Sequence, residues 1–230
     1  MKFKDYKPFE ELKLRSDIFD QFELFYDTLI EENAKYNLTA ITDKDEAIEK
    51  HFYDSIVLLK EFDLSNSNVM DIGSGGGFPA IPLAICCPSA NFYLVESSAK
   101  KCKFLNLVKE KLNLKNVTVI CGRVEENPAN LRSFFDFCTS RAVTQLRILL
   151  ELSIPYLKVN GELLAHKGIN YQIEINDSKL SFENLNSKVV KEFEYNLENC
   201  KQTRYILDIK KLKETDKKYP RKYSQIVSNK

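Results

Sequence analysis

The pattern of hydrophobic and polar positions divides the chain into two parts. Residues 1–67 carry apolar side chains at helical spacing, as in the stripe formed by Phe22, Phe25 and Leu29. Residues 68–230 instead alternate short apolar runs with amphipathic stretches. We therefore expect an N-terminal helical extension packed on one compact unit, with no internal repeat or low-complexity linker.

Five apolar runs in the second part have the length of buried strands, and helical stretches separate them. Strands that alternate with helices predict an α/β fold with a parallel, doubly wound, Rossmann-like sheet. Two further β-like runs near the end of the chain predict an antiparallel edge. The expected strands are residues 69–72, 92–96, 117–121, 135–140, 161–166, 188–197 and 202–211. The expected helices are residues 16–35, 43–61, 79–86, 99–113 and 144–157.

A glycine-rich loop follows the first of these strands. Residues 69–72 are apolar or buried-strand types, and residues 73–77 then contain four glycines. Glycine permits positive φ and leaves no side chain between the backbone and a ligand. We therefore expect Gly73 and Gly75 to let backbone N–H groups approach a ligand in a cleft at the end of the strand.

The loop alone does not identify the ligand, because nicotinamide, flavin and S-adenosylmethionine enzymes all use one. Its sequence, Gly-Ser-Gly-Gly-Gly, departs from the Gly-x-Gly-x-x-Gly of dinucleotide sites. Asp71 stands two residues before the first glycine, which resembles class I S-adenosylmethionine methyltransferases. The stretch favours a methyltransferase, with a dinucleotide enzyme as the alternative.

Side chains at the next strand ends fit a nucleoside. Glu96 ends the second strand, and its two carboxylate oxygens match the vicinal hydroxyls of a ribose; a surface glutamate is the alternative interpretation. Val124 and Glu125 follow the third strand on the same edge, where they can meet an adenine. The fourth strand ends in Ser140-Arg141 and lacks the acidic signature with which many class I methyltransferases hold an exocyclic amine.

Composition narrows the class of protein. The chain is 43% hydrophobic and 29% charged, and no segment approaches the roughly 20 apolar residues that span a bilayer. Residues 1–11 are charged and lack the apolar core of a signal peptide, so we expect a cytoplasmic protein with no membrane partner. The 6 cysteines form no Cys-x-x-Cys pair and the 2 histidines are far apart in sequence, so we expect no metal site.

Charge is unevenly distributed along a chain whose net charge is only +1. Residues 10–61 contain 14 acidic and 6 basic residues, whereas residues 210–230 contain 8 basic and 2 acidic residues. This asymmetry suggests a local site for an anionic partner near the C-terminus. A solvated basic tail explains the same counts.

Several stretches occur together in the order of a known family. They are Asn37-Leu38-Thr39-Ala40, His51-Phe52-Tyr53-Asp54-Ser55, residues 71–79, Ser140-Arg141-Ala142 and His166-Lys167-Gly168. On these residues the chain resembles the RsmG/GidB family, which methylates the 7-nitrogen of a guanine in small-subunit ribosomal RNA. The similarity extends to the C-terminal Tyr219-Pro220-Arg221. Two positions depart from it, because many members have Gly at Ala80 and Ala at Val124.

The resemblance implies a cofactor, a substrate and roles for the matching residues. S-adenosyl-L-methionine would be the cofactor, and 16S ribosomal RNA, free or in the small-subunit particle, the partner; we expect a monomer. Guanine N7 has a free lone pair, so no general base is required and no catalytic residue is assigned with certainty. The implied cofactor-binding residues are Gly73, Gly75, Phe78, Glu96, Val124, Glu125 and Arg141, of which Arg141 lies near the methyl group. The implied RNA-binding residues are Lys167, Arg204 and Arg221.

Two other functions stay open at this point. A non-catalytic RNA- or ribosome-binding module could share the fold, although the intact glycine loop and Glu96 argue against it. A small-molecule or protein methyltransferase could share the cofactor site. His51 and Asp54 stand at helical spacing, and a His–Asp pair is more often a structural bond than a catalytic one. The exact nucleotide is not specified by the sequence.

Overall fold

Seven strands form one central sheet in the computed structural model, which describes residues 1–126 and 130–228. The strands are β1 (Asn68–Ile72), β2 (Asn91–Glu96), β3 (Val117–Cys121), β4 (Phe135–Arg141), β5 (Leu157–Lys167), β6 (Ser187–Leu197) and β7 (Gln202–Lys211). Their order in the sheet is β3-β2-β1-β4-β5-β7-β6. The first five are parallel, and β7 is antiparallel to both β5 and β6. The doubly wound sheet with an antiparallel edge is therefore confirmed.

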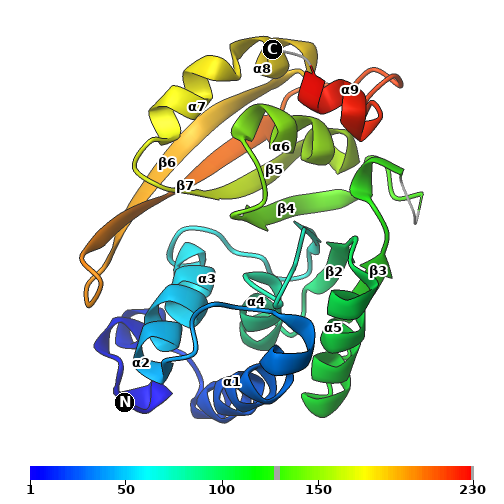
Figure 1. Cartoon of the computed structure of the whole chain (residues 1–230). Helices are drawn as coiled ribbons and strands as arrows, with labels where there is room; N and C mark the ends of the chain where they lie inside the picture. The colour runs from blue at the N-terminus through cyan, green and yellow to red at the C-terminus, as the bar shows by residue number, and fades with distance from the viewer. Residues whose placement is uncertain (127–129, 229–230) are drawn as a thin grey trace.

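Helices cover both faces of this sheet. The N-terminal part contains η1 (Phe3–Asp5), η2 (Lys7–Leu12), α1 (Ser16–Tyr36), α2 (Lys44–Ala47), η3 (Ile48–Tyr53), α3 (Asp54–Ile56) and η4 (Val57–Lys60). Later helices are α4 (Ala80–Cys86), α5 (Ala99–Lys111), η5 (Val124–Glu126), α6 (Leu146–Ser153), η6 (Ile154–Tyr156), α7 (Tyr171–Asp177), α8 (Lys179–Asn184) and α9 (Tyr223–Ser228). Figure 1 shows the N-terminal helices with α4 and α5 on one side, and α6 to α9 on the other. Within the described ranges, no helix has the length and apolarity needed to cross a membrane.

Helix boundaries differ most from the expected ones in two places. Residues 43–61, expected as one helix, instead form four short pieces over residues 44–60, of which η3 is π-helical. Such wide helical turns are rare in proteins, but those that do occur are often found at functional sites. The helix expected to reach residue 157 ends at Ser153, because Pro155 has no N–H to continue it. Consequently β5 starts at Leu157, four residues earlier than expected.

Aromatic side chains pack the N-terminal part onto the sheet. The ring centroid of Phe52, in η3, lies 4.5 Å from that of Phe3, 5.0 Å from Phe22 and 5.4 Å from Phe78. Phe3, Phe22 and Phe52 are fully buried. The same cluster continues into β1, β2 and α4, so the extension and this face of the sheet share one core.

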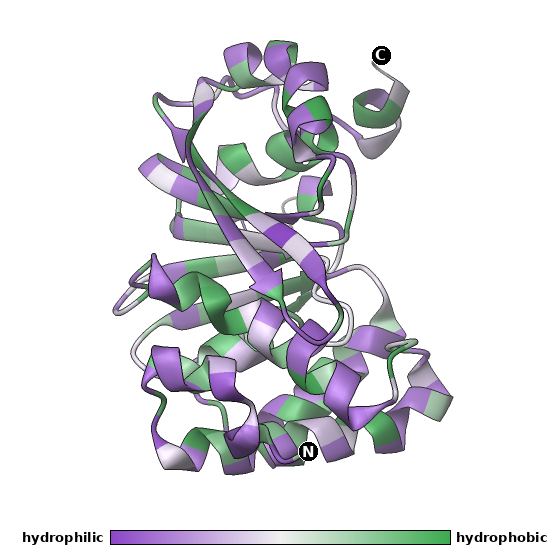
Figure 2. Cartoon of the chain, turned by 90° about the vertical axis from the view of Figure 1, so that its left-hand side faces the viewer, coloured by the Kyte–Doolittle hydropathy of each residue, from purple (hydrophilic) through white to green (hydrophobic). Residues whose placement is uncertain are grey.

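The hairpin of β6 and β7 is tied to the N-terminal part at its turn. Glu49, in η3, accepts hydrogen bonds from the backbone N–H groups of Asn199 and Cys200, at 2.7 and 2.9 Å. The Tyr6 hydroxyl donates to the same carboxylate at 2.7 Å. Hydrophilic and hydrophobic positions alternate along residues 192–197 of the edge strand β6, whereas β7, between β5 and β6, is buried over residues 205–209 (Figure 2).

The basic C-terminal segment is held against α6. Arg221 donates from Nε and Nη2 to the buried Glu151, at 2.8 and 2.6 Å. Arg132 donates to the carbonyl oxygens of Thr215 and Asp216, at 2.7 and 3.0 Å. Up to residue 228 this segment is therefore part of the fold and not a solvated tail. Lys230, one of its basic residues, lies outside the described residues.

Phe52→Ala is expected to lower the free energy of unfolding by about 3–5 kcal/mol, because it opens a cavity among rings that cannot collapse into it. Leu24→Ala is the matched control, since Leu24 is 43% exposed and its loss should cost less than about 0.5 kcal/mol. Urea unfolding of both variants measures the difference. Equal losses of unfolding free energy in the two variants would contradict the inference that the aromatic cluster attaches the N-terminal extension to the sheet.

Candidate active site at the carboxyl edge of the sheet

The strand order reverses at β1, which has β2 on one side and β4 on the other. In doubly wound sheets, ligands bind outside the carboxyl ends of the strands at such a point. The glycine loop follows β1 and Arg141 ends β4, so both predicted features lie at this edge.

Two glycines of the loop have different reasons to lack a side chain. Gly73 has φ +68°, and a Cβ there would lie 2.8 Å from a methyl carbon of Val143, so packing excludes it. Gly75 has φ +55°, but a Cβ there would meet nothing nearer than 3.8 Å. The space outside Gly75 is therefore open to a ligand.

Glu96 joins the end of β2 to the glycine loop. Its carboxylate is buried and accepts hydrogen bonds from the backbone N–H groups of Gly75 and Ser98, at 2.9 and 2.8 Å. A carboxylate offers about four lone-pair sites, so acceptor capacity remains for a ligand hydroxyl. Glu96 is thus both a support of the loop and a candidate ligand contact.

A cavity of about 170 Å³, the small pocket, lies beyond Glu96. Glu125 supplies a buried carboxylate there, and among the described residues its Oε1 finds no hydrogen bond; the Arg123 guanidinium is 3.7 Å away. The rest of the wall is largely apolar and is formed by Ile72, Val95, Val124, Val143, Leu152 and the ring of Tyr223. Such a pocket suits a flat apolar group that donates one hydrogen bond.

A second cavity of about 400 Å³, the polar pocket, lies across the segment after β4 and is lined by Arg141. Arg141 Nη1 lies 2.5 Å from Asp54 Oδ2 and donates to the carbonyl oxygen of Lys50 at 2.9 Å. The guanidinium also lies over the Phe78 ring, 5.3 Å from its centroid. Arg141 is therefore fixed in place before any ligand arrives.

Asp54 is the buried partner that fixes Arg141. The Tyr195 hydroxyl donates to its other oxygen at 2.7 Å. Burial acts to raise the pKa of Asp54, but the charge of Arg141 and the Tyr195 hydrogen bond outweigh it, so this pKa is lowered. Asp54 is ionised at neutral pH and balances the charge of Arg141.

His51 and Asp54, whose roles the sequence left open, take separate hydrogen-bond partners in the structure. His51 Nε2 lies 2.7 Å from the Thr39 hydroxyl, and the imidazole stacks on Phe78 with centroids 4.5 Å apart. Burial, with the charge of Arg141 beside it, lowers the pKa of His51 to about 3. The π-helical turn places His51 on the ring of Phe78 and leaves Asp54 free for Arg141.

Two further buried groups at this edge have shifted protonation. Burial lowers the pKa of His166 to about 4, and its Nε2 has no hydrogen-bond partner in the described part of the chain. Burial raises the pKa of Asp71 to about 7, although the Thr139 hydroxyl donates to it at 2.9 Å. Both groups are poised toward their neutral forms.

The predicted RNA-binding residues do not lie together. Lys167 and Arg204 both line the polar pocket. The Lys167 ammonium is buried and paired with Glu174 at 2.7 Å, while Arg204 donates to Gln202 at 2.8 Å and its Nε has no partner among the described residues. Arg221 lines neither pocket, and its guanidinium is engaged by Glu151. Arg221 therefore has a structural role on α6, and its predicted RNA contact stays a prediction.

The predicted cofactor-binding residues lie along one path, with one exception. Gly73, Val124 and Glu125 line the small pocket, Gly75 and Glu96 are bonded to each other beside it, and Arg141 lines the polar pocket. Phe78 differs, because its ring is buried among His51, Phe25 and Phe52. The Phe78 ring therefore supports the floor under Arg141 and His51.

Other residues of the two pockets gave no such signal in the sequence. Lys50, Thr144, Glu174 and Tyr195 line the polar pocket, and Tyr223 lines the small one. His51, Asp54 and His166 belong to stretches that carried the family resemblance, which was the one available signal for them. No group of three His, Cys, Asp or Glu side chains within the described ranges is arranged to hold a metal ion.

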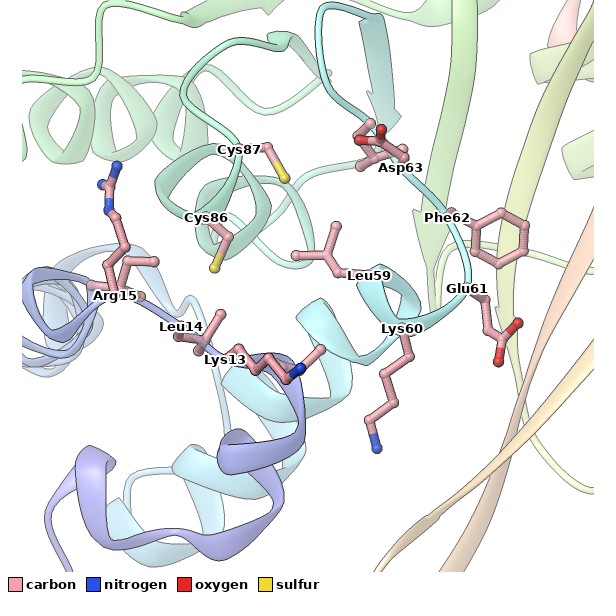
Figure 3. A pocket seen from close by; sticks show the side chains of 13 residues that line it. Lys13, Leu14, Arg15, Leu59, Lys60, Glu61, Phe62, Asp63, Cys86 and Cys87 are labelled. Atoms are coloured by element: carbon pink, nitrogen blue, oxygen red, sulfur yellow. The ribbon is translucent and has the colours of Figure 1, made fainter.

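A third cavity, of about 490 Å³, lies away from this site (Figure 3). The sulfur atoms of Cys86 and Cys87 face Leu14 and Leu59 across it. Because α4 starts at the glycine loop, its end lies toward the opposite edge of the sheet. Burial raises the pKa of Cys86, and that of Cys87 to about 11, so both thiols are protonated and unreactive at neutral pH.

Solved structures share the fold. A SAM dependent methyltransferase from Aquifex aeolicus matches with a TM-score of 0.57 and 19% identity, over 73% of this chain and 94% of that one. M. jannaschii TYW2 in complex with AdoMet matches with a TM-score of 0.56 and 17% identity, over 75% and 80% of the two chains. The architecture is thus that of the S-adenosylmethionine-dependent methyltransferase fold.

Sequence similarity then identifies the family. The family model described as GidB, rRNA small subunit methyltransferase G, matches residues 18–205. Ribosomal RNA small subunit methyltransferase G of Lactococcus lactis subsp. lactis (strain IL1403) is 43% identical over 223 residues, 95% of this chain and 93% of that protein. Its counterpart in Streptococcus pneumoniae (strain ATCC BAA-255 / R6) is 42% identical over 217 residues, 93% and 91% of the two chains. The chain belongs to this family, and the resemblance is confirmed.

Acid should destabilise the fold through His166. The unfolded imidazole takes up a proton near its ordinary pKa of 6.5, whereas the folded one does so only near 4, so the unfolded state binds more protons between these values. Folding therefore loses about 2 kcal/mol between pH 7 and pH 5 through this group. His166→Gln removes that loss. The free energy of unfolding of the variant, relative to that of wild type, should therefore rise by this amount between pH 7 and pH 5.

Urea unfolding of both proteins at pH 7 and pH 5 measures the effect. Asp71 acts with the opposite sign, because its raised pKa makes the folded state bind more protons below about pH 7. Wild type and variant share Asp71, so its contribution cancels in the difference. A pH-independent difference would contradict a buried neutral His166.

Proposed function

We propose that the chain transfers the methyl group of S-adenosyl-L-methionine to the 7-nitrogen of a guanine in 16S ribosomal RNA. The observation that carries the proposal is that the small pocket, the glycine loop held by Glu96, and Arg141 in the polar pocket lie together at one edge of the sheet. The family match over residues 18–205 supports the same reaction.

The residues at this edge fit the cofactor. An adenine would lie in the small pocket, where its exocyclic amine would donate to Glu125 Oε1, which accepts no hydrogen bond from the described residues. The ribose hydroxyls would donate to Glu96, and the methionine part of the cofactor would pass the open side of Gly75. The cofactor supplies a methyl group on a sulfonium, which a lone pair can attack directly.

The polar pocket would hold the guanine. Arginine commonly donates to both O6 and N7 of guanine, but methylation at N7 requires that lone pair to stay free. Arg141, held by Asp54, is therefore suited to donate to O6 alone and to orient N7. No proton leaves N7 during the transfer, so positioning and electrostatics account for catalysis without a general base.

The non-catalytic alternative is less well supported by the same site. A module that only binds RNA has no use for an open space beside Gly75 or for a buried acid at Glu125. We further propose that the enzyme is a monomer and acts in the cytoplasm, where ribosomal RNA, its proposed substrate, is found. Residues 1–67 would be an extension of the methyltransferase domain of residues 68–230, since they share its core.

The function is tested by methylation of 16S ribosomal RNA, and of small-subunit particles, from cells that lack this protein. Labelled S-adenosylmethionine should transfer to a 7-methylguanine that is mapped in the product. Glu96→Ala should weaken the cofactor by about ten-fold or more, because charge-assisted hydrogen bonds to the ribose are lost. Cofactor binding without RNA methylation would favour a small-molecule or protein methyltransferase, and no cofactor binding would favour the module.

RNA phosphates would lie near Arg204 at the mouth of the polar pocket. Arg204→Ala should lower the slope of log affinity for 16S RNA against log salt by about 0.7, since one fewer phosphate is neutralised. Arg221→Ala is the matched control, because it also removes one guanidinium but breaks the pair with Glu151. It should lower thermal stability and leave the salt slope unchanged. The reverse result would favour Arg221 over Arg204 as the RNA contact.

A further inference from the structure

The C-terminal helix α9 supplies the outer wall of the small pocket. Tyr223, its first residue, lines that pocket together with Val124 and Glu125. Tyr223 is 39% exposed, so part of the residue is open to solvent while part of it lines the pocket. The family model ends its match at residue 205, so this wall comes from outside the matched region.

Contacts with α6 hold α9 at this place. Arg147, in α6, donates to the carbonyl oxygen of Ile226 at 3.0 Å. The Ile226 side chain is buried in the core on this face of the sheet. The backbone N–H of Arg221, just before α9, donates to Glu151 at 2.8 Å. The position of Tyr223 is therefore set by the fold before a ligand binds.

The Tyr223 ring is also held from the side of β3. The Arg123 guanidinium lies over it, 5.7 Å from the ring centroid, and is 3.7 Å from Glu125. A cation over the ring face favours this arrangement. Tyr223, Arg123 and Glu125 thus form one connected edge of the small pocket.

We propose that Tyr223 is a cofactor-binding residue whose ring packs against the adenine and closes the small pocket from the solvent side. The inference rests on the proposed function, because it takes S-adenosylmethionine as the ligand. Aromatic side chains bind nucleobases by stacking, because both groups have flat π faces. The ring, and not its hydroxyl, would carry the contact. The ion pair of Arg221 and Glu151 then holds the chain just before α9 in place, and so positions Tyr223.

The test is calorimetric titration of the full chain with S-adenosylmethionine and with 5′-methylthioadenosine, which keeps the adenine and ribose but lacks the amino acid. Tyr223→Ala should weaken both ligands by about ten-fold. Tyr223→Phe should bind as wild type, because it keeps the ring. Val227→Ala is the matched control, since Val227 is equally exposed on the same helix and does not line the pocket.

Each outcome decides between separate claims. If wild type binds both ligands and Tyr223→Ala matches Val227→Ala, the wall assignment is wrong while the proposed function stands. If Tyr223→Ala weakens only S-adenosylmethionine, the ring does not contact the adenine and the assignment is again wrong. If wild type binds neither ligand, the proposed function and this inference both fail. Unchanged thermal unfolding of the ligand-free variants shows that any loss is local.

Discussion

The ion pair between Asp54 and Arg141 is the interaction on which the site depends. It joins the N-terminal helices to the end of β4, and the Tyr195 hydroxyl adds the β6 edge to the same carboxylate. Taking two charges out of water is costly unless the geometry is good and the remaining polar atoms are satisfied. Here Arg141 also donates to the Lys50 carbonyl and lies on the Phe78 ring, which helps to offset that cost. Breaking the pair would leave a buried charge without a partner, which is costly. The pair therefore holds the N-terminal helices, the end of β4 and the β6 edge together around one guanidinium.

Burial around this pair also sets the charge of the polar pocket. Asp54 neutralises Arg141, and the lowered pKa values of His51 and His166 keep both imidazoles uncharged at neutral pH. Arg204 lines the same pocket, and its guanidinium donates to the neutral side chain of Gln202. Under the proposed function, the balanced interior would suit a neutral base, and Arg204 would suit a phosphate of the RNA backbone.

The sequence was sufficient where local rules decide the structure. Parallel strand ends share one edge of a sheet, so the glycine loop, Glu96, Val124 and Glu125 could be brought together from their spacing alone. The Asp54–Tyr195 contact joins positions 141 residues apart, and no local pattern specifies such a pairing. Arg221 shows the limit of counting charges, because its partner Glu151 lies on an apolar helix 70 residues earlier. Tyr223 was missed for the same reason, since its role depends on where the fold places α9.

The two pockets are separated by a single short segment after β4, and this arrangement constrains how a methyl group could pass between them. Ala142 and Thr144 line the polar pocket, whereas Val143 between them lines the small pocket and packs on Gly73. Val143 occupies the space that a side chain at position 73 would need, so the glycine there lets Val143 pack between the two pockets. Gly75, by contrast, leaves space open for a ligand. A cofactor with its adenine in the small pocket must therefore pass beside Gly75 to reach Arg141. The glycine loop and the segment after β4 thus act as one device, which fixes where the transferable methyl would meet the base.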